Sequence, residues 1–235
     1  RLAGCVVAAS APVPALPSLL PCHLAEAPPP GRPLDGPGEL LPGSPFTARL
    51  GDEEVLVAAR RSPQGLRVEA EGFGSVLVSE RGDEVFWYPS GEAARERPEL
   101  VLGPGLVLAL AFRGVFCLHA SAVLGPAGAV VFAAASGAGK STLAARLAAD
   151  AGLPRLADDI LPVTAAASGA SALPHFPQLK LPPSGQYPPV AAGTVPIDRL
   201  FVLAPCRLDE PVAARPLPPS VAALSVCGQA VASRL

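Results

Sequence analysis

The residues best suited to chemistry lie in a short run between an apolar segment and an alanine-rich one. Lys140 is followed by Ser141 and preceded by small residues, among them two glycines. Glycines let consecutive backbone N–H groups turn toward phosphate oxygens, and the start of a following helix adds partial positive charge. The run therefore predicts a nucleotide phosphate-binding loop, formed by Ser136, Gly137, Ala138, Gly139, Lys140, Ser141 and Thr142.

In such a loop, Lys140 would reach the β- and γ-phosphates, and the Ser141 hydroxyl would ligate Mg²⁺. The flanking segments fit this prediction, because residues 129–133 have strand length and residues 143–149 are rich in helix formers. One position departs from the P-loop pattern, since Ala134 stands where the first glycine is usual. The alternative is a small-residue turn whose lysine only extends its stem toward solvent.

A second candidate is the acidic pair Asp158 and Asp159, which follows the expected helix and a turn at residues 152–154. We expect these acids at the end of a strand that neighbours the strand before the loop. One carboxylate would hold Mg²⁺ and the other would accept the proton of an attacking hydroxyl. The alternative is a solvated turn containing two adjacent acids.

Two further segments place a polar side chain among apolar residues. His119 lies on the strand expected before the loop strand, and the alternative to an active-site role is a satisfied core histidine. Lys180 lies in a proline-bounded segment, residues 174–182, for which the alternative is an ordered surface loop. Only Lys140 and Lys180 are lysines among 18 Lys and Arg residues, which favours Lys140 as a compact charge placed for phosphate.

The composition narrows the classes of function. The chain has 235 residues, 50% of them hydrophobic, with a formal net charge of −2 and a pI of about 5.9. No basic run is present, so nucleic acid is not expected as a partner. Five widely spaced cysteines without a C-x-x-C pair argue against a disulfide framework and a structural zinc site, and they favour a cytoplasmic protein.

No segment is expected to span a membrane. The apolar run at residues 100–112 is short and contains Pro104 and Gly105, which favours a buried helix. Residues 1–22 resemble a secretory signal only weakly, because prolines interrupt them. The sequence contains no methionine, which indicates a processed or partial product.

The expected elements divide the chain into three parts. Residues 1–44 form a proline-rich arm that we expect to be irregular. Residues 45–99 predict a small antiparallel β-rich domain without evident chemistry, with strands at 46–50, 54–60, 66–71, 75–80 and 84–88. Residues 100–235 alternate helices with strands, which predicts an α/β domain with a mainly parallel sheet.

Three motifs, in their order and short spacing, resemble the HPr kinase/phosphorylase family. They are His119-Ala120-Ser121-Ala122, the loop from Ser136 to Ser141, and Ala157-Asp158-Asp159. The similarity extends to HPr-kinase-related proteins associated with peptide-modification gene clusters, which also show segments like 175–181 and 200–203. It covers roughly residues 100–205.

The resemblance implies a P-loop serine kinase that uses ATP and Mg²⁺. It also implies a mainly parallel or mixed sheet, like that of HPr kinase and phosphoenolpyruvate carboxykinase. In this chain Lys140 would bind the phosphates, and Ser141 and Asp158 would bind the metal. Asp159 would be the catalytic base, His119 would line the active site, and Lys180 would contact the transferring phosphoryl group.

Two departures from the family leave other functions open. The further acidic metal ligand of the family is missing, because no Asp or Glu lies between residues 161 and 197. The chain also ends where relatives carry more helix. The first hypothesis is ATP-dependent phosphorylation of a serine on a protein or peptide. The alternatives are a catalytically weak nucleotide-binding or regulatory module of a peptide-modification system and, third, an ATPase. The phosphoacceptor and the oligomeric state are not encoded in any motif.

Overall fold

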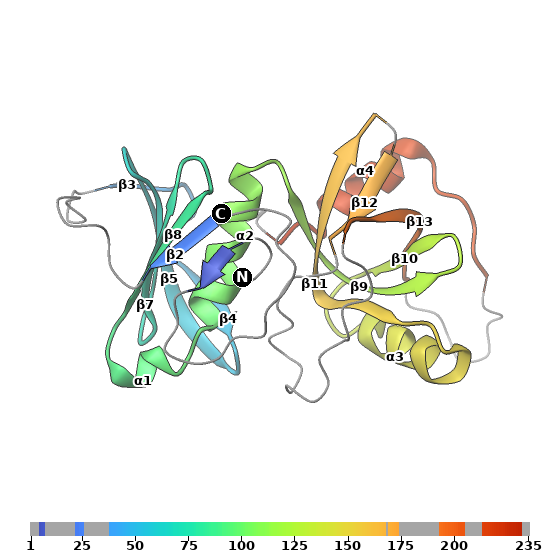
Figure 1. Cartoon of the computed structure of the whole chain (residues 1–235), viewed down its shortest axis with the longest axis horizontal. Helices are drawn as coiled ribbons and strands as arrows, with labels where there is room; N and C mark the ends of the chain where they lie inside the picture. The colour runs from blue at the N-terminus through green and yellow to red at the C-terminus, as the bar shows by residue number, and fades with distance from the viewer. Residues whose placement is uncertain are drawn as a thin grey trace. The chain divides into compact units, whose positions relative to one another are not determined.

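The structure is a computed structural model that describes residues 5–7, 22–25, 38–167, 169–173, 193–204 and 213–231. The described residues fall into two compact units, which we consider separately (Figure 1). The first unit runs to Val115, and the second begins at Phe116.

The first unit contains an eight-stranded sheet in the order β1, β2, β8, β7, β6, β5, β3, with β4 also paired to β5. The pairs β1–β2 and β2–β8 are parallel, and the remaining pairs are antiparallel. The strands are β1 (Cys5–Val7), β2 (Cys22–Ala25), β3 (Glu39–Leu40), β4 (Phe46–Leu50), β5 (Glu53–Ser62), β6 (Gly65–Ala70), β7 (Gly74–Ser79) and β8 (Glu84–Pro89). Its helices are α1 (Glu92–Arg95), η1 (Val101–Gly105) and α2 (Leu106–Phe112).

The core of this unit lies between one face of the sheet and its helices. In β5 the buried residues Val55, Val57 and Ala59 alternate with more exposed ones, as expected for a strand with one covered face. The π-helical turn η1 packs closely on that sheet, because a Cβ placed on Gly105 would lie 3.4 Å from Cγ1 of Val85. The apolar run at 100–112 is thus a buried helical segment, as predicted.

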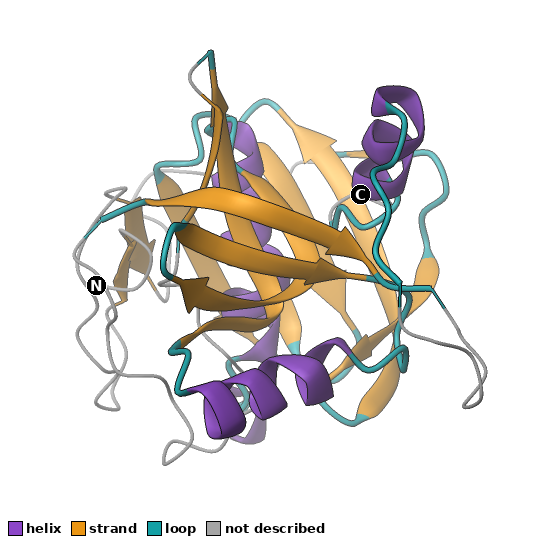
Figure 2. Cartoon of the chain, turned by 90° about the vertical axis from the view of Figure 1, so that its right-hand side faces the viewer, coloured by secondary structure: helices purple, strands orange, loops and turns teal. Residues whose placement is uncertain are grey.

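The second unit is a closed five-stranded barrel in the order β10, β13, β12, β11, β9. Only β10 and β13 pair in parallel within it, and the other four pairs are antiparallel. Helix α3 lies along one side of the barrel and α4 at another (Figure 2). The elements are β9 (Phe116–Gly125), β10 (Gly128–Ala133), α3 (Lys140–Ala151), β11 (Arg155–Ala166), β12 (Gly169–Ala172), β13 (Val195–Val202) and α4 (Pro219–Cys227).

The barrel has a narrow interior filled by small and branched side chains. Ala120, Ala122 and Ala129 are fully buried there beside Val131 and Leu161. So few strands enclose little space, which accounts for the many alanines in these strands. A second apolar cluster joins the outside of the barrel to α3 through Val123, Phe132 and Ala144.

The predicted fold class is wrong. The sequence predicts an α/β kinase core with a mainly parallel sheet, whereas the two sheets are mostly antiparallel, with a closed barrel in the second unit. The physical reason lies around α3. Strands β10 and β11 run in the same direction, but β9 lies between them and is antiparallel to both. Alternation of strand and helix along the chain therefore did not produce neighbouring parallel strands.

The barrel closure at Gly128 gives a testable prediction. Gly128 has a φ of +145°, and a Cβ there would collide with the main-chain oxygen of Pro196 in β13. Gly128→Ala should lower the free energy of unfolding by about 2–4 kcal/mol, because it combines backbone strain with a clash against a rigid strand. Urea unfolding followed by circular dichroism measures this loss.

Gly152→Ala is the matched control in the same unit. Gly152 also has a positive φ, +65°, but nothing lies within 4 Å of the position that a Cβ would take. Its replacement should cost only about 1 kcal/mol. Equal losses for the two variants would contradict the close approach of β10 and β13 at this point.

Candidate functional site

The predicted loop leaves the barrel where β10 ends. Ala134 is buried, the next five residues are exposed, and α3 begins directly at Lys140. Gly137 and Gly139 have φ values of +80° and +89°, in the left-handed region that favours glycine. The N–H of Ala138 donates to the oxygen of Ala135 at 3.3 Å and closes a turn. The loop is thus an exposed turn between a buried strand and a helix, as its sequence predicts.

Lys140 is a buried cation beneath this turn, with 5% of its surface exposed. Its Nζ donates to the main-chain oxygens of Ala134 at 2.8 Å and of Ala135 at 3.1 Å. Burying an ammonium group is costly unless polar atoms replace the water it loses, and these carbonyls do so. The contacts hold one positive charge at the junction of strand, loop and helix, while Ser141 and Thr142 lie exposed in the first turn of α3.

The strand register brings the acidic pair to the level of the loop. Asp159 pairs with Ala120 of β9, and Ala120 pairs on its other side with Ala133, the last residue of β10. The loop strand and the acid strand are therefore separated by β9, at about 10 Å, or two strand spacings. The expectation that the acids lie on a strand neighbouring β10 is wrong. So is their placement at a strand's end, because β11 continues to Ala166.

Asp158 is the buried member of the pair, with 8% of its surface exposed. The Ser121 hydroxyl donates to its Oδ1 at 2.8 Å, and the Arg155 guanidinium donates to its Oδ2 at 2.8 Å. Both carboxylate oxygens are therefore engaged within the barrel wall. Neither Ser121 nor Arg155 was assigned a role from sequence, although the register of β9 with β11 would have placed Ser121 opposite Asp158.

Asp159 points to a different environment. Its φ is +97°, and among the described residues it is the only non-glycine residue with a positive φ. Such backbone geometry is strained in an L-residue and is found more often at functional sites. Nδ1 of His119 lies 3.1 Å from both the main-chain oxygen and Oδ1 of Asp159. When Nδ1 carries a hydrogen, His119 donates to this residue and fixes the direction of its carboxylate.

A short segment after α4 completes the surroundings of His119. The N–H of His119 donates to the oxygen of Gln229 at 2.8 Å, and the N–H of Val231 donates to the oxygen of Cys117 at 2.8 Å. Residues 229–231 therefore lie along β9 at residues 117–119, a stretch that β10 does not pair with. Burial raises the pKa of the Cys117 thiol to about 12, so this cysteine is not a nucleophile at neutral pH.

The remaining sequence-predicted residues fall elsewhere. Lys180 and its segment lie outside the described residues. In the parts of the chain that the structure describes, no three His, Cys, Asp or Glu side chains form a group able to hold a metal ion. Within the same ranges, no helix is both long and apolar enough to cross a membrane.

Comparison with known proteins adds no relative: no protein-family model matches the chain, and no curated protein shows significant similarity to it.

The clamp on Asp158 gives a second prediction. Arg155→Met removes the guanidinium from a pair whose side chains are 18% and 10% exposed, leaving a buried carboxylate without this partner. We expect a loss of about 3 kcal/mol in the free energy of unfolding. Chemical denaturation of the variant and the unmodified chain measures it.

Arg146→Met is the control, because the Arg146–Asp150 pair spans 4.0 Å and its side chains are 75% and 68% exposed. That variant should lose no more than about 0.5 kcal/mol. A loss for Arg155→Met as small as this would show that the buried clamp contributes little to the barrel.

Proposed function

We propose that this protein binds ATP through the loop at residues 134–142 and transfers its γ-phosphoryl group to a serine hydroxyl of a protein or peptide. The observation that carries the proposal is the buried ammonium of Lys140, held 2.8 Å and 3.1 Å from two loop carbonyls beneath an exposed glycine turn. A cation fixed at a helix start beside turned backbone is the arrangement that phosphate binding requires. The resemblance to HPr-kinase-related proteins supports the same reaction.

Features of the loop and of α3 support a triphosphate as the ligand. The turn at 135–139 is exposed, and its two left-handed glycines leave open space where a Cβ would stand. The N-terminal N–H groups of α3 have no partners within the helix and favour an anion. Lys140 would exchange its carbonyl partners for phosphate oxygens. The Ser141 hydroxyl would hold Mg²⁺ together with water, and the ion would neutralise charge on the phosphates.

The acceptor chemistry falls to Asp159 and His119. A serine hydroxyl placed between the loop and β11 would give its proton to the Asp159 carboxylate as its oxygen bonds to the γ-phosphorus. The bond from that phosphorus to the β–γ bridging oxygen breaks, and ADP leaves. His119 would keep the Asp159 carboxylate oriented through the 3.1 Å contact to Oδ1. Positioning and charge neutralisation account for most of the rate in such transfers. We place this activity in the cytoplasm, where ATP is available.

Replacing Lys140 tests the loop. Lys140→Met should weaken binding of Mg-ATP by about 10- to 100-fold, because a charge-assisted contact to phosphate is lost while the side-chain length is kept. Isothermal titration calorimetry on the full chain measures the affinity. Arg146→Met removes an exposed cation from the same helix and should leave the affinity unchanged. Unaltered ATP binding in Lys140→Met would overturn the proposed phosphate site.

Replacing Asp159 tests the proposed base. Asp159→Asn retains the shape of the side chain, and asparagine tolerates a positive φ, so the backbone should persist. Transfer of radiolabelled γ-phosphate from ATP to a library of serine-containing peptides should fall by about 100-fold or more, with ATP affinity nearly unchanged. Asp150→Asn, at the exposed end of α3, is the control. Undiminished transfer by Asp159→Asn would exclude Asp159 as the base.

One observation favours the second candidate function, a nucleotide-binding regulatory module. Each oxygen of Asp158 already accepts a hydrogen bond, one from Ser121 and one from Arg155, and these partners compete with a metal ion for this carboxylate. A module of this kind would bind Mg-ATP as tightly as the proposed kinase. Tight binding together with no labelled acceptor in the peptide library would favour it over phosphotransfer.

A further inference from the structure

An exposed aromatic ring lies beside the strand that leads into the loop. Phe201 of β13 is 37% exposed, whereas its neighbour Phe132 on β10 is 4% exposed. The two rings are stacked, with centroids 6.0 Å apart and planes inclined by 19°. The buried ring thus fixes the orientation of the exposed one, and Phe201 presents apolar surface to solvent in a strand that otherwise helps to close the barrel.

The register places this ring close to the loop. Phe201 pairs with Phe132 in the parallel β10–β13 ladder, and the N–H of Leu203 donates to the oxygen of Ala133 at 2.9 Å. Phe132 precedes Ala134 by two residues. With a rise of about 3.3 Å per residue and a strand spacing of about 4.8 Å, the Cα of Phe201 lies about 8 Å from the start of the loop. An extended nucleoside triphosphate is longer than this distance.

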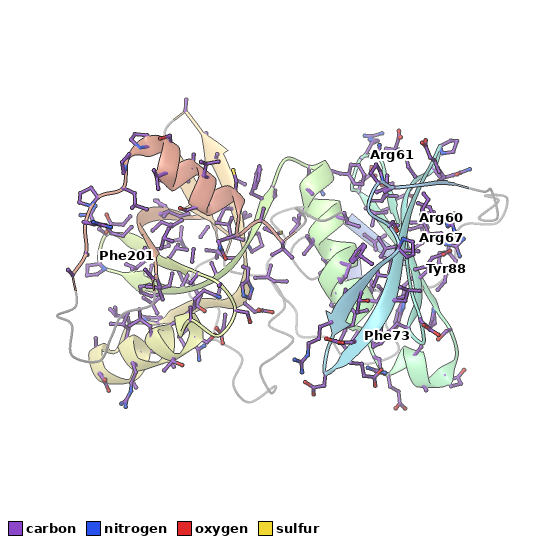
Figure 3. All side chains as sticks on the ribbon, turned by 180° about the vertical axis from the view of Figure 1, so that it is seen from behind. Arg60, Arg61, Arg67, Phe73, Tyr88 and Phe201 are labelled. Carbon is purple, nitrogen blue, oxygen red and sulfur yellow. The ribbon has the colours of Figure 1, made fainter. Side chains whose placement is uncertain are left out.

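The ring also lies on the same side of the sheet as the helix that begins at the loop. Phe132 packs in one cluster with Ala144 of α3, with Leu143 and Leu147 against it. Because the rings are stacked in register, Phe201 shares this face, and Figure 3 shows it between the strands and α3. A ligand whose phosphates lie at the start of α3 therefore has an aromatic platform within reach beside the same helix.

We propose that Phe201 stacks against the base of the nucleotide whose phosphates occupy the loop. The inference rests on the proposed function, and it adds the requirement for a nucleobase at this site. Stacking on an aromatic ring is tolerant of base identity, because every base has a π-face. The site should therefore prefer nucleoside triphosphates over inorganic tripolyphosphate, with modest discrimination between adenine and guanine.

Calorimetric titration of the full chain with Mg-ATP, Mg-GTP and inorganic tripolyphosphate tests the proposal. The unmodified chain should bind ATP and GTP about tenfold or more tightly than tripolyphosphate. Phe201→Ala should reduce the affinity for both nucleotides to that for tripolyphosphate, while tripolyphosphate binding stays unchanged and shows that the variant is folded. Phe116→Ala, which removes a ring that is 60% exposed on β9, is the matched control and should change none of the three affinities.

A fluorescent variant gives an independent measurement. Trp87 is the only tryptophan, and it lies buried in the first unit. Phe201→Trp therefore adds one reporter at the proposed platform, and the signal of the unmodified chain gives the background. Its emission should be quenched by Mg-ATP and not by tripolyphosphate, because only the nucleotide carries a base.

The outcomes separate this inference from the function on which it rests. Equal affinity of the unmodified chain for ATP and tripolyphosphate would overturn the stacking role and leave the phosphate-binding loop standing. A Phe201→Ala variant that keeps full affinity for the nucleotides would also overturn the stacking role. The same holds for a variant whose affinity for tripolyphosphate falls as much as its affinity for the nucleotides. Absence of binding to any of the three probes would overturn the proposed function and the stacking role together.

Discussion

The candidate site depends on the pairing of one strand, β9, along both of its edges. Ala120 pairs with Ala133 on one side and with Asp159 on the other. The end of β10 and the acidic residue of β11 therefore lie at the same level across the sheet. Within the described residues, β10 and β11 do not pair with each other. Each of these strands pairs with β9 instead. The alanines of β9 also fit the narrow barrel interior. A shift of one residue in this register would turn Asp158 and Asp159 to opposite faces from those they now occupy.

The two adjacent acids contact different residues of β9, Ser121 and His119, which are two residues apart and lie on the same side of that strand. The backbone of Asp159, with a φ of +97°, departs from extended strand geometry, so simple alternation does not set the direction of its side chain. Asp158 is directed to Ser121 and Arg155, which engage both of its oxygens, and Asp159 to His119 at the less buried surface. The cationic partner of the site comes from elsewhere, because Lys140 is held under the loop by the carbonyls of Ala134 and Ala135. The barrel thus holds Asp158 by two hydrogen bonds, whereas the strained backbone of Asp159 marks the position at which we propose the chemistry.

The sequence predicts the individual strands better than the order in which those strands pair. The five strands predicted between residues 46 and 88 are present as β4 to β8, and the two strands expected before the loop are present as β9 and β10. Period-two burial and glycine turns encode these features locally. The parallel sheet was wrong, because the order of strands across a sheet is set by long-range pairing, which strand–helix alternation does not encode. The partners of Asp158 were missed for a related reason: Ser121 lies 37 residues away from it in sequence. The roles of the loop, His119 and Asp159 stay predictions.

The segment at residues 229–231 has a consequence for how this barrel behaves at high concentration. Beyond the reach of β10, the N–H of His119 and the oxygen of Cys117 would otherwise be open main-chain groups on one edge of β9. Unpaired strand edges recruit strands from other molecules and promote aggregation. Because the chain's own residues occupy this edge, the stretch of β9 at residues 117–119 offers no template for intermolecular pairing.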